Sequence, residues 1–198
     1  MNFPMALRPQ TLAQWTIYGC WIAFAVYWAV AAASTKRTVY QRRGLWRTGY
    51  FLIVIVGVAL IGNSYRAPYP LNLLVVSQTR AVSIGTAAVC VIGLIFTVWA
   101  RRTLGRNWSG TVTLKENHEL VRRGPYALVR HPIYTGLLTM LAGSTIFAGY
   151  LGCFLGFAIV GFSLWVKLRH EEALMLQEFP ADYPAYAKRV RRLIPFVL

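Results

Sequence analysis

The chain has 198 residues, of which 57% are hydrophobic and 14% are charged, and this composition is too apolar for a soluble domain of this length. Its formal net charge of +15 could suit a nucleic-acid partner. However, the apolar runs divide the chain into polar segments, and every second one of these segments together holds 18 of the 21 Lys and Arg residues. This pattern is typical of a membrane protein, so we expect the lipid bilayer as a partner and no nucleic acid.

Five apolar runs are long enough to be membrane spans, and we expect each of them to form a helix. They cover residues 12–34, 48–63, 81–100, 133–150 and 151–166. The first should be a retained anchor rather than a cleaved signal peptide, because five basic residues follow it directly. The second is short, so its helix should start near Leu45 or continue past Asn63, and residues 71–76 could be an interfacial piece. The predicted fold class is all-α, a polytopic membrane protein with about five transmembrane helices.

The basic residues concentrate in three segments, which are residues 35–47, residues 101–132 and the tail that begins at Lys167. The positive-inside rule predicts that these segments are cytoplasmic and that the N-terminus lies outside. We therefore expect a multi-pass protein of the cell membrane or inner membrane, with its active site and C-terminus in the cytoplasm.

All six acidic residues lie in the last 83 positions, on the segments assigned to the cytoplasm. We therefore expect a single membrane domain, residues 1–198, in which residues 1–100 form a three-helix scaffold and residues 101–198 hold the chemistry. The three cysteines lie inside separate apolar runs, with no second cysteine or histidine nearby, so neither a disulfide nor a metal site is expected.

The last two spans should form a tight helical hairpin, because almost no linker separates them around Gly149 and Gly152. Gly152 and Gly156 share a helix face, on which a neighbouring helix could approach closely. Beyond the last span the helix should continue to Glu178, and Pro180 then breaks it. The amphipathic tail that follows is either a membrane anchor or a lid over a site.

The stretch VRRGPYALVRHPIYTG, residues 121–136, crowds charged and aromatic groups at the start of the fourth span. Pro132 suits the first position of a helix, which places His131 at the helix entrance. Free N–H groups and the positive end of the helix dipole attract an anion at such an entrance. Arg130 would add positive charge there.

Further polar and aromatic groups should face this entrance. Tyr126 and Tyr134 each offer a ring face and a hydroxyl, although an interfacial aromatic belt would also explain them. Because the hairpin is short, residues 167–172 at the end of the fifth span should lie at the same depth. Two adjacent glutamates there suggest a cationic ligand, while Lys167 and Glu171 could be only a surface ion pair. These groups would fit a zwitterionic, aromatic and cationic cofactor such as S-adenosylmethionine, but the residues alone do not single it out.

Five ordered elements of the chain are similar to those of one known family. They are LGRNWS (104–109), HELV (118–121), RGPYALVRHPIYTG (123–136), KLRHEE (167–172) and FPADYPAYAKRVRRLIP (179–195). By these elements the chain resembles the isoprenylcysteine carboxyl methyltransferase family, particularly its compact prokaryotic members. The resemblance implies an all-helical membrane enzyme that binds S-adenosylmethionine in a cytosolic pocket formed by the last helical hairpin and the C-terminal tail.

The resemblance also implies roles for individual residues. Those expected to bind the cofactor are Thr111, His118, Glu119, Leu120, Val121, Tyr126, His131, Pro132, Ile133, Tyr134 and Glu171. Lys167 falls near the position where eukaryotic members have a substrate-contacting arginine, and Arg169 is the other candidate for that role. Lys167 departs from the family pattern in this respect, as does Pro180, which stands where the family commonly has glycine. Pro180 would change the turn of the tail, and the substitution at Lys167 leaves the identity of the substrate open.

The resulting hypothesis is a methyltransferase that moves a methyl group from S-adenosylmethionine to a lipophilic or small acceptor at the membrane. A carboxylate acceptor needs no general base, whereas an amine, thiol or phenol would need one. The candidates for accepting that proton are Glu172, Glu171, His131 and Tyr134. Catalytic roles are expected for Lys167, Arg169 and Glu172. The alternatives are a sterol-reductase-like membrane enzyme that uses NADPH and a non-catalytic lipid-binding scaffold.

Overall fold

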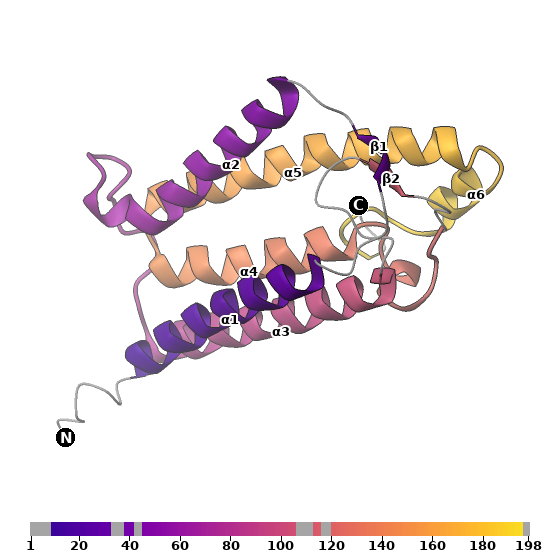
Figure 1. The fold of residues 1–198 in the computed structure, drawn as a ribbon. Coiled ribbons are helices and arrows are strands. Elements are labelled where there is room, and N and C mark those ends of the chain that lie inside the picture. The colour runs from indigo at the N-terminus through magenta and orange to yellow at the C-terminus, as the bar shows by residue number, and fades with distance from the viewer. Residues whose placement is uncertain (1–8, 33–37, 42–44, 106–112, 116–119, 196–198) are drawn as a thin grey trace.

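Five long helices make up most of the structure, a computed structural model that describes residues 9–32, 38–41, 45–105, 113–115 and 120–195 (Figure 1). In chain order they are α1 (Pro9–Ala32), α2 (Leu45–Asn63), α3 (Arg80–Leu104), α4 (Pro132–Ala148) and α5 (Leu151–Glu178). The short elements are β1 (Thr38–Gln41), η2 (Ser64–Arg66), β2 (Thr113–Lys115), η4 (Gly124–Ala127) and α6 (Asp182–Arg189). The two strands pair in antiparallel fashion, with Thr38 opposite Lys115 and Gln41 opposite Thr113. The sequence did not predict this small ribbon.

Four helices, α1, α2, α3 and α5, are long and apolar enough to cross a membrane. Helix α4 is a shorter apolar helix of 17 residues. All five predicted apolar runs are therefore helical, and the prediction of an all-α polytopic membrane protein is confirmed. Helix α2 begins at Leu45, which supplies the length that its short apolar run lacks.

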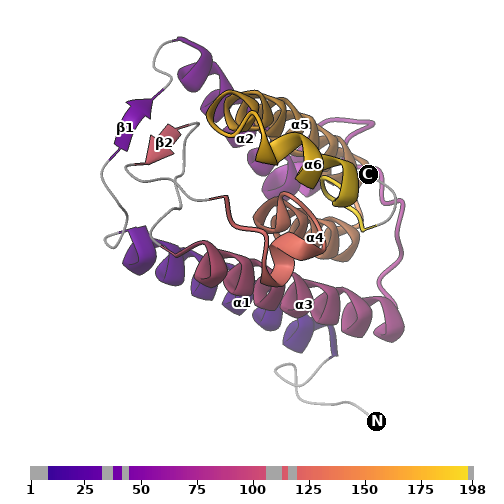
Figure 2. The ribbon, with the colours of Figure 1, turned by 90° about the vertical axis from the view of Figure 1, so that its right-hand side faces the viewer.

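The helices pack as two groups that lie against each other (Figures 1 and 2). Helix α3 packs against both α1 and α4, while α2 runs along α5, and α4 also contacts α5. A Cβ at Gly93 of α3 would lie 2.8 Å from the oxygen of Gly136 in α4. A Cβ at Gly156 of α5 would lie 2.5 Å from the oxygen of Gly57 in α2. Only glycine permits these backbones to come so close, so the close approach expected on the face of Gly152 and Gly156 occurs. The neighbour of Gly156 is α2, and that of Gly152 is Ser64 of η2.

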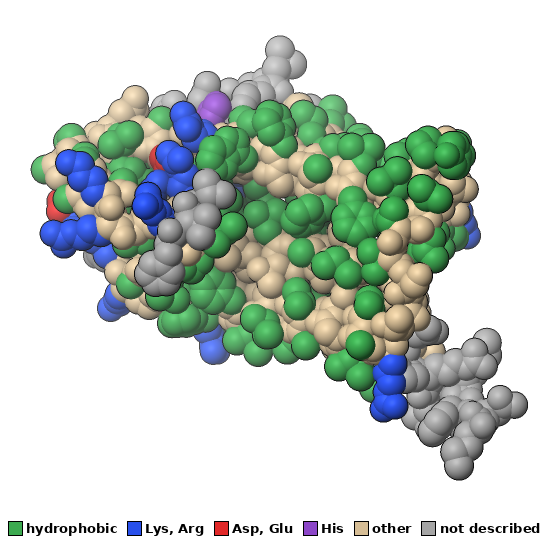
Figure 3. Space-filling model, turned by 180° about the vertical axis from the view of Figure 1, so that it is seen from behind, with side chains coloured by type: hydrophobic (Ala, Val, Ile, Leu, Met, Phe, Trp, Pro, Cys, Tyr) green, Lys and Arg blue, Asp and Glu red, His purple; other side chains and the backbone are tan. Residues whose placement is uncertain are grey.

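The helices alternate in direction, so α1, α3 and α5 finish at the same end of the bundle, where α4 begins (Figure 1). This end, which also carries β1, β2, η4 and α6, is called the polar end. Lys and Arg side chains gather mainly at one end of the molecule, while hydrophobic side chains cover the length of the helices (Figure 3). Large exposed hydrophobic residues are spread along α1, α2 and α3. This is the surface expected of a helix bundle surrounded by lipid.

The opposite end of the bundle is closed by the loop of residues 67–79, which joins α2 to α3. The N–H of Leu151 at the start of α5 donates to the oxygen of Leu73 at 2.8 Å. This loop, which contains the expected interfacial piece, thus binds N–H groups that the first turn of a helix leaves without a partner. Only Gly149 and Tyr150 separate α4 from α5, as the sequence predicted for a tight hairpin.

Candidate functional site

The candidate site forms at the polar end, where α4 begins beside the C-terminal part of α5. Pro132 is the first residue of α4, a position where its missing N–H costs nothing, and His131 precedes the helix. The last described residues, 190–195, run past this entrance and are called the strap. The N–H of Arg130 donates to the strap at 2.7 Å, and the N–H of His131 donates to the oxygen of Arg192 at 2.9 Å. The strap is therefore held along the helix entrance by its backbone.

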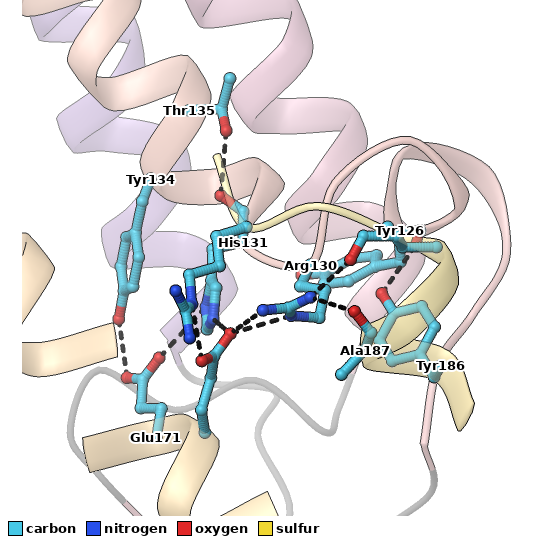
Figure 4. A network of polar contacts seen from close by, with 11 residues as sticks. Tyr126, Arg130, His131, Tyr134, Thr135, Glu171, Tyr186 and Ala187 are labelled. Carbon is cyan, nitrogen blue, oxygen red and sulfur yellow. Dashed lines mark hydrogen bonds and ion pairs between the residues drawn. The ribbon is translucent and has the colours of Figure 1, made fainter. Parts of the chain in front are cut away.

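Glu172 of α5 is buried among positively charged side chains. Its Oε1 accepts a hydrogen bond from Nε of Arg130 at 2.8 Å, and its Oε2 accepts one from Nε of Arg192 at 2.8 Å. Nε2 of His131 lies 3.3 Å from the same Oε1. Arg130 also donates from Nη1 to the oxygen of Ala187 at 2.8 Å (Figure 4). Arg130, expected to add positive charge for an anion, is thus neutralised within the protein, and Glu172 links α5 to the helix entrance and the strap.

Glu171, the preceding residue, has different partners, and its side chain is 23% exposed, against 9% for Glu172. The hydroxyl of Tyr134 donates to its Oε1 at 2.7 Å (Figure 4). Nδ1 of His131 lies 3.8 Å from its Oε2. The rings of His131 and Tyr134 stack with centroids 5.6 Å apart and planes 6° apart. A partly open carboxylate therefore stands beside two aromatic rings, a combination that attracts a cation.

Lys167 brings a positive charge into the same group of side chains. Its own side chain is 10% exposed, and its Nζ lies 3.8 Å from Oε1 of Glu171. The same Nζ lies 5.3 Å from the ring centroid of Tyr134 and 5.6 Å from that of Tyr50. Tyr50 belongs to α2, so a helix predicted to be scaffold contributes a side chain to the site. Sequence reasoning missed it, because its place depends on how α2 packs along α5.

Further hydrogen bonds fasten α6 and the strap to the start of α4. The hydroxyl of Tyr186 donates to the oxygen of Tyr126 at 2.6 Å, and the hydroxyl of Thr135 donates to the oxygen of Leu193 at 2.7 Å. Burial raises the pKa of Tyr186 from 10.0 to about 12, so its hydroxyl keeps its proton and remains a donor beyond the pH at which an exposed tyrosine ionises. The tail, expected as an anchor or a lid, therefore packs on the protein's own helix entrance.

An apolar cluster lies beside this polar network. Tyr126 of η4 and Ile133 of α4 pack around Ala100 of α3, and Val121 and Tyr134 pack against them. Because Tyr134 belongs to both groups, aromatic and apolar surface adjoins the carboxylate directly.

The structure brings most of the predicted site residues together. Those in the polar network or the apolar cluster are Val121, Tyr126, His131, Ile133, Tyr134, Lys167, Glu171 and Glu172. Pro132 is buried at the start of α4, and Leu120 is half-buried. Arg169 is exposed and, at two residues from Lys167, lies on a different side of α5. Thr111, His118 and Glu119 lie outside the described residues. Arg192, which sequence reasoning did not select, joins the network through the fold of the tail.

Residues 86–177 match the sequence model of the isoprenylcysteine carboxyl methyltransferase family. The chain is 31% identical over 110 residues to protein-S-isoprenylcysteine O-methyltransferase B of Arabidopsis thaliana, and this alignment covers 54% of the chain and 56% of that protein. It is 30% identical over 135 residues to the protein-S-isoprenylcysteine O-methyltransferase of Saccharomyces cerevisiae, covering 64% of the chain and 55% of that protein. The chain thus spans about half the length of these curated relatives. The matched segment runs from α3 through α4 into the last turn of α5, and over this segment the chain is similar to the isoprenylcysteine carboxyl methyltransferase family.

Proposed function

We propose that the protein is an S-adenosylmethionine-dependent methyltransferase that acts at the membrane. Its similarity to this family and the names of its relatives support this activity. The structural observation that carries the proposal is the grouping of Glu171, Tyr134 and His131 at the entrance of α4, inside the segment that matches the family. A carboxylate beside stacked rings suits a ligand that has both a positive charge and an aromatic part.

The side chains present fit S-adenosylmethionine. When bound, this cofactor supplies a methyl group on a positively charged sulfur. The carboxylate of Glu171 and the ring of Tyr134 would hold the positive charge, and the apolar cluster around Tyr126 and Ile133 would cover the adenine. His131 stacks on Tyr134 and would hold that ring in place, which favours alignment and keeps water from this side of the site.

We further propose that the acceptor is the carboxylate of an S-isoprenylcysteine, the group in the names of the relatives. A carboxylate attacks without losing a proton, so the site needs no general base. Glu172 would be a poor base, because two arginines already bind its carboxylate, and it suits a positioning role better. Of the two basic candidates for contacting the acceptor, Lys167 adjoins the site and Arg169 does not.

The polar end would then face the cytoplasm, with the N-terminus on the other side. The support is the count of 18 among 21 Lys and Arg residues in the segments expected at that end. In this arrangement residues 1–100 serve mainly as scaffold within one membrane domain, residues 1–198, apart from the contribution of Tyr50. Exposed apolar flanks along the helices would let an acceptor with an isoprenyl chain approach from the bilayer.

A methyl-transfer assay tests the proposed activity. Protein purified in detergent is given S-adenosylmethionine with a labelled methyl group and N-acetyl-S-farnesylcysteine as acceptor. We expect a labelled methyl ester, which releases labelled methanol on mild base hydrolysis. The same acceptor with its carboxylate already esterified should stay unlabelled, and a saturated fatty acid should be a poorer acceptor if the thioether side chain is recognised.

A binding measurement separates the proposed function from its alternatives. S-adenosylhomocysteine should raise the thermal unfolding temperature of the detergent-solubilised protein, and NADPH should leave it unchanged. Glu171→Gln, which keeps the size of the side chain and removes its charge, should weaken binding of S-adenosylmethionine. Stabilisation by NADPH and none by S-adenosylhomocysteine would show that the protein is not a methyltransferase.

A further inference from the structure

The ammonium group of Lys167 lies inside a set of contacts that would suit a cationic ligand. Three helices supply them: the ring of Tyr50 comes from α2, the ring of Tyr134 from α4 and the carboxylate of Glu171 from α5. Aromatic faces together with a carboxylate are the groups by which proteins recognise positively charged ligands. The protein's own cation thus stands where the proposed function needs the charge of S-adenosylmethionine to bind.

We infer that Lys167 is an internal competitor for this position and makes the site distinguish the charged cofactor from its product, S-adenosylhomocysteine. The two molecules differ at the sulfur, which carries a methyl group and a positive charge only in the first. This inference rests on the proposed function. It adds that the site discriminates between S-adenosylmethionine and S-adenosylhomocysteine by the charge on the sulfur.

Among the residues that the structure describes here, Glu171 is the one carboxylate available for the two positive charges. Glu172 is bound by Arg130 and Arg192, so it offers no second binding place for a cation. A charged sulfur beside Glu171 would either repel the ammonium of Lys167 at close range or force it out of its contacts with the rings. The flexible four-carbon stem of lysine lets the ammonium move toward water, at the cost of those contacts. In both cases the penalty falls on S-adenosylmethionine and not on the product.

The same penalty disappears as the methyl group is transferred. The bond between sulfur and the methyl carbon breaks with its electron pair left on sulfur, while a lone pair of the acceptor carboxylate forms the new bond to carbon. The sulfur is then neutral, and Lys167 returns to Glu171 and the two rings. Lys167 therefore destabilises the charged ground state more than the transition state, in which the charge is already leaving the sulfur.

Dissociation constants of the two ligands for the full-length protein in detergent, measured by calorimetry without acceptor, test the inference. In Lys167→Met the affinity for S-adenosylmethionine relative to S-adenosylhomocysteine should rise about tenfold or more. Lys167→Arg, which keeps the charge, should keep the wild-type ratio, and Lys167→Gln replaces the methionine variant if the latter does not fold. Arg169→Met is the matched control, because it removes an exposed cation from the same helix two residues away.

An unchanged ratio in the neutral Lys167 variants would overturn the inference, as would an equal rise in the Arg169 variant, which would show a general effect of net charge. If Lys167 served only to bind the acceptor, the neutral variants would raise KM for the acceptor and leave the ratio alone, which also overturns it. Failure of the wild-type protein to bind either ligand would instead refute the proposed function.

Discussion

Replacing Glu172 by glutamine tests whether this carboxylate is what fastens the strap and α6 to the bundle. The side chains of Arg130 and Glu172 are only 7% and 9% exposed, so the substitution leaves a buried guanidinium without its partner. Breaking a buried ion pair from one side typically costs about 3–5 kcal/mol. Arg192 contributes less to this cost, because its side chain is 31% exposed and can turn to water.

The loss should be local, because the partners of Glu172 bind the tail. Arg130 also holds the oxygen of Ala187 in α6, and Arg192 belongs to the strap. A cost of about 3 kcal/mol corresponds to a rise of about 100-fold in the opening equilibrium of the tail. Hydrogen exchange followed by mass spectrometry in detergent should show this rise in residues 179–195, while the middle of α3 keeps its protection.

Asp182→Asn provides the matched control. It breaks the ion pair between Asp182 and Arg122. The side chains of Arg122 and Asp182 are 45% and 59% exposed, so this change should cost less than about 1 kcal/mol. Combining Glu172→Gln with Arg130→Met should cost less than the sum of the two single changes, because the second change removes the stranded charge. Unchanged exchange in the tail of the Glu172 variant, or strict additivity in the double variant, would refute the assignment of Glu172 as the fastening residue.

Three further changes probe the packing, the aromatic surface and the tail. Gly156→Leu places a Cβ 2.5 Å from the backbone oxygen of Gly57 in α2 and should destabilise the protein by about 1–3 kcal/mol in thermal unfolding. Gly62→Leu, whose Cβ would have nothing within 4 Å, should not. Tyr134→Leu should weaken S-adenosylmethionine binding about tenfold in calorimetry and Tyr134→Phe much less, because phenylalanine keeps the ring face. Because burial raises the pKa of Tyr186 from 10.0 to about 12, the folded state holds this proton more tightly than the unfolded state. Its stabilisation is complete below pH 10 and is lost toward pH 12, so Tyr186→Phe should show a smaller fall in unfolding temperature above pH 10 than the wild type.

The sequence predicted the helices well, because each is an apolar run, but it predicted the partners of those helices poorly. Gly156 indicated that another helix comes close, yet only the fold shows that this helix is α2 rather than α4. The ribbon of β1 and β2 joins residues 38–41 to residues 113–115, and neither segment carries a local pattern that indicates the pairing. Pairing between distant segments depends on the packing of everything between them, which hydropathy does not describe.

For the site, the hairpin made part of the geometry predictable. A short turn between α4 and α5 brings His131 and Glu171 to the same depth in the bundle. In the structure Nδ1 of His131 lies 3.8 Å from Oε2 of Glu171. The positions of Tyr50 and Arg192 could not be predicted in this way, because one depends on the packing of α2 and the other on the path of the strap. Pro180, a departure from the family pattern, stands between α5 and α6, where it is compatible with a tail that folds back on the helix entrance.

Two adjacent glutamates have separate roles here, because consecutive residues on a helix point about 100° apart. That rotation turns Glu172 toward Arg130 and the strap, and turns Glu171 toward Tyr134 and Lys167. A single carboxylate could not serve both groups, since binding two arginines would leave it no affinity for a cationic ligand. With Glu172 bound to the two arginines, the carboxylate of Glu171 is left to Tyr134 and Lys167 at the same helix end, and this separation would make the proposed cation site possible on so basic a surface.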